Sequence, residues 1–182
     1  MKKIVLFLLL AAVSFSLVAQ QDSPTAKGIK VINIGTGLFG GSGGANFIPI
    51  HFGVDFLVVN NLSVGGDLNW RYYSSQGVVG KPSLISLQAV IDYHLNEVMH
   101  LSPQWDFYGG VKLGPGYMTT DKDKEAFNMN YSNGVKFVAD FRAGTRYYFN
   151  DHMGINAEIG VLTVSGTKTT GAEFLIGITI KN

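Results

Sequence analysis

A serine in a glycine cluster and a nearby histidine are the residues whose types and spacing come nearest to a catalytic site. Gly40-Gly41-Ser42-Gly43-Gly44 matches the Gly-x-Ser-x-Gly pattern of a nucleophilic serine, and His51 follows as a candidate base. That pattern needs a helix after the serine, and no helical period follows here. Asp55 lies two pleats beyond His51, too far to orient the imidazole ring. We therefore assign no catalytic residue and expect a protein that is not an enzyme.

Two further stretches resemble ligand-binding loops and then depart from them. Asp121-Lys122-Asp123-Lys124-Glu125 places acids at alternate positions, but Ala126 stands where a calcium loop needs glycine and Ser132 where it needs glutamate. We interpret this segment as a run of charged residues exposed to solvent. Gly37–Gly44 lacks the Lys-Ser/Thr pair and the helix of a phosphate loop, which favours a hairpin tip. No cofactor is expected.

Composition excludes several other classes of site. The chain has no cysteine, which rules out disulfides, thiolate zinc sites and thiol catalysis. His94, His100 and His152 are irregularly spaced, so we predict solvated turn residues and no metal site. A formal net charge of +1 leaves no basic field for nucleic acid. With 46% hydrophobic and 15% charged residues, the composition favours a β protein with an apolar surface.

The start of the chain is predicted to be a signal peptide. Lys2 and Lys3 precede the apolar run Ile4–Val13, and a cleavage site follows Ala19 or Gln20. The apolar run is shorter than the roughly 20 residues of a spanning helix, so any membrane span after export must be made of strands. The predicted divisions are a signal peptide at 1–20, a short N-terminal segment at 21–27 and one barrel domain at 28–182.

From residue 28 onward, apolar and polar side chains alternate with the period of two that is typical of β-strands. Each run supplies the roughly 9–11 residues that a tilted strand needs to cross a bilayer. The pattern predicts an all-β fold, an antiparallel up-and-down transmembrane β-barrel of about eight strands. The runs are Gly28–Gly40, Phe47–Val59, Ser63–Ser74, Ser83–Leu95, Trp105–Thr119, Gly134–Phe149, Met153–Ser165 and Ala172–Ile180.

The polar face of these strands is rich in glycine and carries similar numbers of acidic and basic side chains. This composition indicates that the polar face points into the barrel. A solvated face would be rich in Lys and Glu and poor in glycine, because glycine weakens strands. A narrow barrel interior accounts for both features. Eight strands leave room only for side chains inside, which favours a structural network of paired charges over a channel. The predicted interior charges are Asp55, Asp67, Arg71, Asp92, Lys112, Asp140, Arg142, Arg146, Glu158 and Glu173.

Outward aromatic residues fall into two groups at opposite strand ends, as interfacial girdles would. They are Trp70, Tyr72, Tyr117 and Phe174 at one end, and Tyr93, Trp105, Phe107, Tyr147 and Phe149 at the other.

Loop lengths predict the orientation of the barrel. With the N-terminus on the periplasmic side, the inner connections are Asn60-Asn61, Asn96–Gln104 and Asn150–His152. The outer ones are Gly41–Asn46, Ser75–Pro82, Thr120–Ser132 and Gly166–Gly171. The longest loop is outer, as in outer-membrane barrels, whereas Asn96–Gln104 is longer than expected for an inner turn.

The strand register follows from which residues face lipid. If Val58 and Val64 both face lipid, paired positions sum to an even number, so the hairpin at Asn60-Asn61 needs a bulge or an odd-length loop. The same parity centres a later turn on Asp151. The residues that this register makes neighbours inside the barrel are Arg142, Arg146, Asn156 and Glu158.

A likeness to a known family lies in Leu62–Gly66, in Trp105–Gly114 and, most specifically, in the hairpin Gly144–Gly160. These stretches resemble the small outer-membrane β-barrel proteins of Bacteroidota, a porin-like family similar in architecture to the eight-stranded OmpA/OmpX-type barrels. The likeness runs from about Gly28 to the C-terminus and implies location in the cell outer membrane. Such barrels commonly end in an aromatic residue read by the assembly machinery, whereas this chain ends Thr179-Ile180-Lys181-Asn182.

The predicted function is an outer-membrane barrel with a structural or surface-interaction role. The expected partners are outer-membrane lipid, the outer-membrane assembly machinery and an unidentified ligand of the outer loops, with the barrel a monomer. One alternative is a small gated pore for ions or small solutes. A second is a soluble exported barrel that binds an apolar ligand, which requires an inward apolar face: Ile48, Phe52, Leu68, Phe141 and Ile176.

Overall fold

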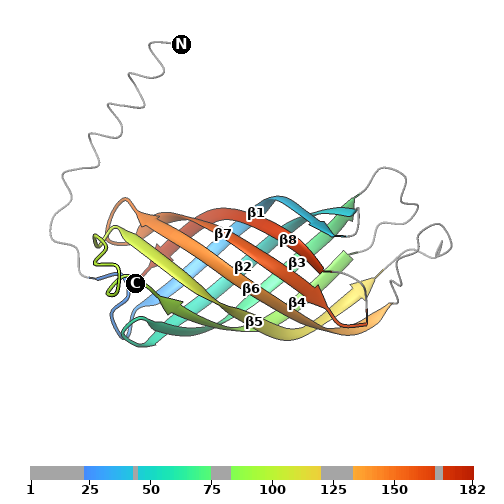
Figure 1. The fold of residues 1–182 in the computed structure, drawn as a ribbon, viewed down its shortest axis with the longest axis horizontal. Helices are drawn as coiled ribbons and strands as arrows, with labels where there is room; N and C mark the ends of the chain where they lie inside the picture. The colour runs from blue at the N-terminus through green and yellow to red at the C-terminus, as the bar shows by residue number, and fades with distance from the viewer. Residues whose placement is uncertain (1–22, 43–44, 75–82, 120–132, 167–169) are drawn as a thin grey trace, which may run out of the picture.

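Eight antiparallel strands close into a barrel in the computed structural model, which describes residues 23–42, 45–74, 83–119, 133–166 and 170–182 (Figure 1). Each strand pairs with the next along the chain, and the first pairs with the last to close the sheet. The predicted fold class is confirmed. The strands are β1 (Lys30–Ser42), β2 (Ala45–Val59), β3 (Leu62–Ser74), β4 (Ser83–His94), β5 (Trp105–Thr119), β6 (Gly134–Tyr148), β7 (Met153–Val164) and β8 (Thr170–Lys181).

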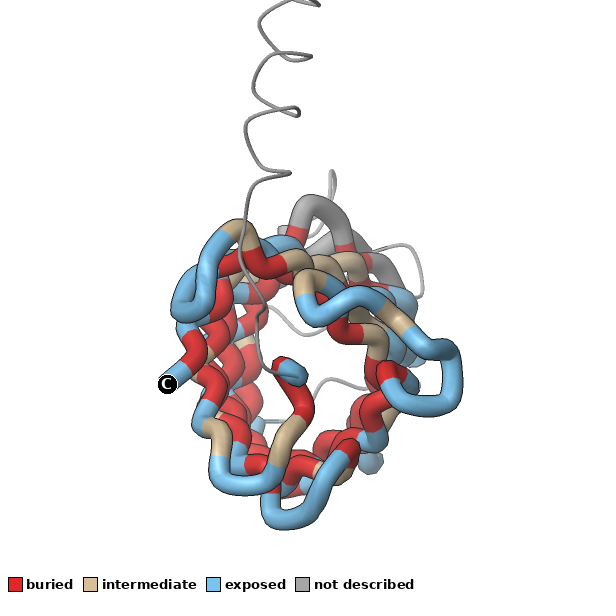
Figure 2. The backbone as a smooth tube through the Cα atoms, turned by 90° about the vertical axis from the view of Figure 1, so that its left-hand side faces the viewer, coloured by how far each residue is buried: buried red, intermediate tan, exposed pale blue. Residues whose placement is uncertain are grey.

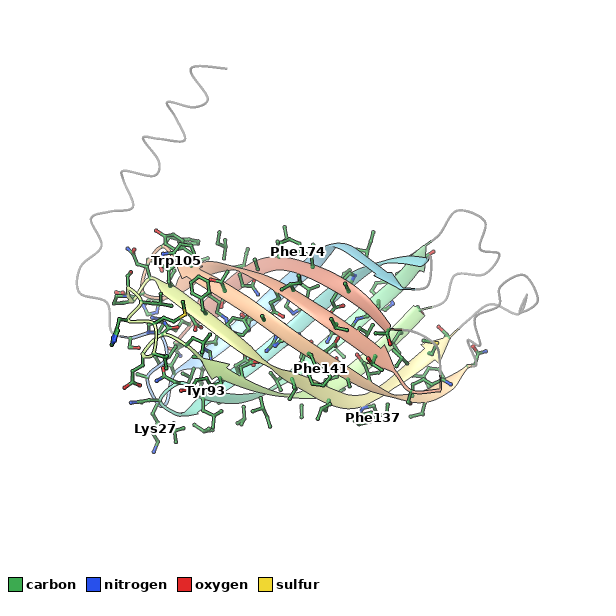
Figure 3. All side chains as sticks on the ribbon, viewed as in Figure 1. Lys27, Tyr93, Trp105, Phe137, Phe141 and Phe174 are labelled. Atoms are coloured by element: carbon green, nitrogen blue, oxygen red, sulfur yellow. The ribbon has the colours of Figure 1, made fainter. Side chains whose placement is uncertain are left out.

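Side chains alternate between the lumen and the outer wall, most regularly along β4 and β7. The outer wall is apolar: Phe141 is 61% exposed there, and Phe137 also lies on it (Figure 3). The second alternative, a soluble barrel with an apolar lumen, is therefore wrong. The five residues that it needs inside are all exposed on the outer wall: Ile48, Phe52, Leu68, Phe141 and Ile176. In the described parts of the chain, no helix is long and apolar enough to span a membrane.

The two hairpins analysed in the sequence have the predicted parity. Phe56 pairs with Val64, and the register then shifts at Val58 so that Val59 pairs with Leu62. This bulge allows Asn60-Asn61 to close the hairpin as a tight turn without turning the apolar face inward, because one extra residue restores the alternation. In β6 and β7, Arg146 pairs with Asn156, which centres that turn on Asp151 as predicted.

The end of the barrel that carries the termini of the described chain, Ser23 and Asn182, is covered by residues 23–28, which curl into its opening (Figure 2). Asn61 donates its backbone N–H to the Thr25 carbonyl over 3.0 Å, and the Thr25 hydroxyl donates to the Asn61 side chain over 2.8 Å. Gly28 N donates to the Leu57 carbonyl of β2 over 2.8 Å. This short segment therefore extends the barrel's hydrogen bonding across its mouth.

Two side chains, those of Asn96 and Glu97, help to hold the long inner connection at 96–104. Asn96 donates to the Trp105 carbonyl and accepts from the Phe107 N–H over 3.1 Å. Its neighbour Glu97 accepts a hydrogen bond from the Asn61 side chain, which ties the connection to the turn that binds Thr25. The extra length thus joins two parts of the barrel mouth, which a minimal two-residue turn could not reach.

Glycine on the inner face is required where strands approach closely. A Cβ atom at Gly114 of β5 would collide with the backbone carbonyl oxygen of Leu87 in β4. Gly66 of β3 faces the outer wall, and the nearest atom to a Cβ built there is the Gln88 carbonyl oxygen at 3.9 Å. These two positions form a matched pair, since both are strand glycines but only one is crowded.

Gly114→Ala should destabilise the folded barrel by about 1–3 kcal/mol, the usual cost of overpacking, whereas Gly66→Ala should be neutral or slightly stabilising. Urea unfolding in phospholipid vesicles, followed by tryptophan fluorescence, measures both changes. The shift in gel mobility between unheated and heated samples confirms that each variant folds. Equal stability of the two variants would show that the close approach between β4 and β5 does not constrain the sequence.

Candidate functional site

The lumen is the candidate site, because it holds all ten charged residues that the sequence analysis singled out. Each of the ten is at most 7% exposed. Each of the four cations bridges two carboxylates that belong to different strands. Such an arrangement meets the requirement that buried charges be paired and hydrogen-bonded. The charges form three clusters that follow one another along the barrel axis.

The first cluster surrounds Arg146, near the end that carries the termini. Its guanidinium donates to Asp55 of β2 over 2.8 Å and to Asp106 of β5 over 2.9 Å. A third hydrogen bond, of 3.3 Å, reaches the Asn33 side chain in β1. The ring of Tyr108 lies 4.2 Å from the guanidinium carbon, a cation–π distance. One fully buried side chain thus connects four strands.

His94 belongs to the same cluster, and its prediction as a solvated turn residue is wrong. The ring is fully buried, with Nδ1 2.7 Å from Asp106 Oδ1 and Nε2 3.1 Å from Ser63 Oγ. The serine, histidine and aspartate contact one another in the same order as in a Ser-His-Asp catalytic triad. Ser63 and His94, however, have no exposed surface, and Asp106 also accepts from Arg146. In this conformation no substrate reaches the serine, and the three side chains act as a cross-link between β3, β4 and β5.

The second cluster surrounds Arg142, in the middle of the barrel. Arg142 donates to Asp92 of β4 over 3.1 Å and to Glu158 of β7 over 2.9 Å, the diagonal neighbour that register predicts. Glu158 also accepts from the Tyr108 hydroxyl over 2.8 Å. The ammonium of Lys112 in β5 lies 3.5 Å from Glu158 and forms an ion pair with it. The Glu158 carboxylate is therefore shared among three partners, Arg142, Tyr108 and Lys112.

The third cluster surrounds Arg71, towards the end away from the termini. Arg71 donates to Asp140 of β6 over 2.8 Å and to Glu173 of β8 over 3.1 Å. Gln88 of β4 donates to the same Asp140 oxygen over 3.2 Å. Lys112 links this cluster to the second: its ammonium lies 3.1 Å from Asp67, and the Asn69 side chain donates both to Asp67 and, over 3.1 Å, to Gln88. The cross-links thus run nearly the length of the lumen.

Sequence reasoning missed an apolar layer beyond Arg71. Its five side chains are at most 1% exposed and come from four adjacent strands: Leu84, Met118, Val138, Leu162 and Val164. They occupy inward positions at the far ends of β4 to β7, where the polar face of each run becomes apolar. This change from polar to apolar residues along the inward face was the signal in the sequence that could have predicted the layer. These apolar side chains fill the lumen next to the ion pairs of Arg71.

The other candidate residues are dispersed. His51 lies inside the lumen, 1% exposed and with Nδ1 3.5 Å from Asp67. The side chain of Ser42 and the whole of Asp121–Glu125 lie outside the described residues. His100 and His152 are exposed in turns, as predicted. Within the described ranges, no group of three or more His, Asp or Glu side chains is placed to hold a metal ion.

Comparison with known proteins finds one matching family and several solved structures with a similar fold. The family model described as outer membrane protein beta-barrel domain matches residues 5–180. The structure is similar to that of Neisserial surface protein A, with 13% identity, a TM-score of 0.64, and coverage of 85% of this chain and 97% of that one. It is also similar to OprG of Pseudomonas aeruginosa, with 12% identity, a TM-score of 0.60, and coverage of 88% and 99%.

A third similar structure is Ail, the attachment invasion locus protein of Yersinia pestis, with 14% identity, a TM-score of 0.55, and coverage of 86% and 99%. At these identities the likeness concerns the fold alone. None of the curated proteins compared with this chain matches it.

Arg142→Met should lower the free energy of unfolding by about 3–5 kcal/mol, because it leaves Asp92 and Glu158 buried with too few donors. Arg142→Lys should fall in between, since it keeps the charge but not the forked geometry. The exposed Lys27 provides the control, and Lys27→Met should change stability by about 0.5 kcal/mol or less. Urea unfolding in vesicles measures all three. An Arg142→Met barrel as stable as the Lys27 control would contradict a role of the ion pairs in holding the fold.

Proposed function

This chain belongs to the outer membrane protein beta-barrel domain family, and from that premise we propose that it is a closed outer-membrane barrel with a structural or surface-interaction role. In this role the barrel anchors its loops at the membrane surface and carries out no catalysis. Outer-membrane lipid surrounds the wall, and the assembly machinery of that membrane inserts the chain. The barrel acts as a monomer, and its outer loops contact an extracellular ligand.

The observation that carries this proposal is the filling of the lumen. Arg71, Arg142 and Arg146 each reach across the barrel to carboxylates on other strands, and their heads lie where a solute would have to pass. Moving any of them aside would leave two buried carboxylates without their donor, at a cost of several kcal/mol. The apolar layer at one end and residues 23–28 at the other add two further obstacles. Together these features argue against the gated-pore alternative.

The names of similar structures are compatible with a surface role. One is a surface protein and another an attachment invasion locus protein, which has also been solved with the heparin analogue sucrose octasulfate. We propose a role of that general kind here. Residues 1–20 would serve as the signal peptide for export, and the termini would then lie on the periplasmic side, opposite the predicted outer loops.

Purified, refolded barrel should produce no stepwise conductance in planar lipid bilayers, because ions would have to cross the paired charges and the apolar layer. Samples whose unheated band migrates faster than the heated band supply the folded protein for this measurement. Protein-dependent conductance steps of uniform size would favour the pore and overturn the closed-barrel proposal.

The proposed orientation can be read by cysteine labelling, since the chain has no cysteine of its own. Ser102 is exposed in the inner connection, and Lys124 lies in the predicted outer loop Thr120–Ser132. A membrane-impermeant maleimide added to intact cells should label Lys124→Cys and should label Ser102→Cys only after the outer membrane is permeabilised. The reverse pattern would invert the orientation, and labelling of neither after permeabilisation would place the protein elsewhere.

A further inference from the structure

The outer wall has an apolar hollow of about 810 Å³ that spans β5 to β8 and β1. Its lining combines small side chains, Thr145, Ala157 and Thr36, with larger ones that include Trp105, Tyr147 and Ile178. Strand register explains the shape. Thr145 pairs with Ala157 in one row across the sheet, which continues through Ile176 to Thr36. The adjacent row carries only large side chains: Trp105, Tyr147, Ile155, Ile178 and Ile34. The three small side chains of the first row leave a depression beside the larger ones.

We propose that this hollow binds an acyl chain of a membrane phospholipid, and the proposal rests on the outer-membrane placement given above. The lining offers almost no polar contact. The Thr36 hydroxyl donates to the Pro49 carbonyl over 3.1 Å, and Asn156 is 4% exposed because its side chain faces the lumen. An occupant therefore gains dispersion contacts but no hydrogen bonds, which suits a hydrocarbon chain.

The position of the hollow fixes which end of the lipid lies where. Trp105 stands at the end of the barrel that carries the termini (Figure 3), and its ring centroid is 4.8 Å from that of Tyr147. Tryptophan and tyrosine prefer the level of lipid headgroups. The headgroup thus lies beside Trp105, and the acyl chain runs from there over Ala157 towards the middle of the wall. The lipid belongs to the leaflet on the side of the termini.

One substitution fills the hollow and a matched one does not. Ala157→Leu adds bulk to its lining, whereas Ala89→Leu adds the same bulk on the exposed outer face of β4, away from the hollow. Native mass spectrometry of barrels extracted from phosphatidylcholine vesicles should find one lipid retained by the wild type and by Ala89→Leu. The lipid-bound fraction should fall several-fold for Ala157→Leu, with the heat-dependent gel shift unchanged.

Tryptophan fluorescence separates failure of this site from failure of membrane placement. The chain has two tryptophans, so Trp70→Phe leaves Trp105 as the only reporter. Brominated phosphatidylcholine should quench Trp105 in the Trp70→Phe background, and adding Ala157→Leu should reduce that quenching where Ala89→Leu does not. Quenching and lipid retention that are equal in both variants would overturn the lipid site while leaving the barrel in the membrane. Absence of quenching throughout would overturn the membrane placement, and a dimer lost on Ala157→Leu would replace the lipid with a second copy of the chain.

Discussion

The constraint on which this structure depends is the narrow width of a closed eight-stranded sheet. Such a barrel encloses a space that side chains fill, so little water remains to solvate a charge inside it. Every inward charge must then find its partner across the lumen. The chain meets this requirement by giving each of its four bridging cations two carboxylates on other strands. Sheet closure therefore brings the partners together, and the ion pairs in turn cross-link the strands.

Crowding inside the barrel also explains much of the glycine content. Tyr108 lies between Arg142 and Arg146, and its ring occupies the space that a Cβ atom at Gly144 would need. His51 occupies the corresponding space beside Gly35. Large polar side chains lie flat against the wall only where the neighbouring strand has no side chain. The glycines thus complement the charges, which accounts for a polar face that is both charged and rich in glycine.

Alternation with a period of two is a local property, and it was enough to predict eight strands, both faces and two hairpin registers. The identity of the charge partners is not local. Arg71 meets Glu173 across 102 positions of sequence, and Arg146 meets Asp55 across 91. Side-chain length and the curvature of the barrel decide such pairs, and neither is visible in a periodicity. His94 was misjudged for the same reason, because its partners Ser63 and Asp106 come from the two neighbouring strands.

A lumen whose bridging cations are each held by two carboxylates has little freedom to do anything else. Binding a solute there would require a guanidinium to exchange carboxylates on two strands for the solute, and the displaced carboxylates would remain buried. The outer wall has no such restriction: its side chains contact lipid one at a time, and a small residue such as Ala157 leaves space without leaving a charge unpaired. Selective contacts are therefore expected on the outside of the barrel, along the wall and at its loops, while the interior keeps the scaffold rigid.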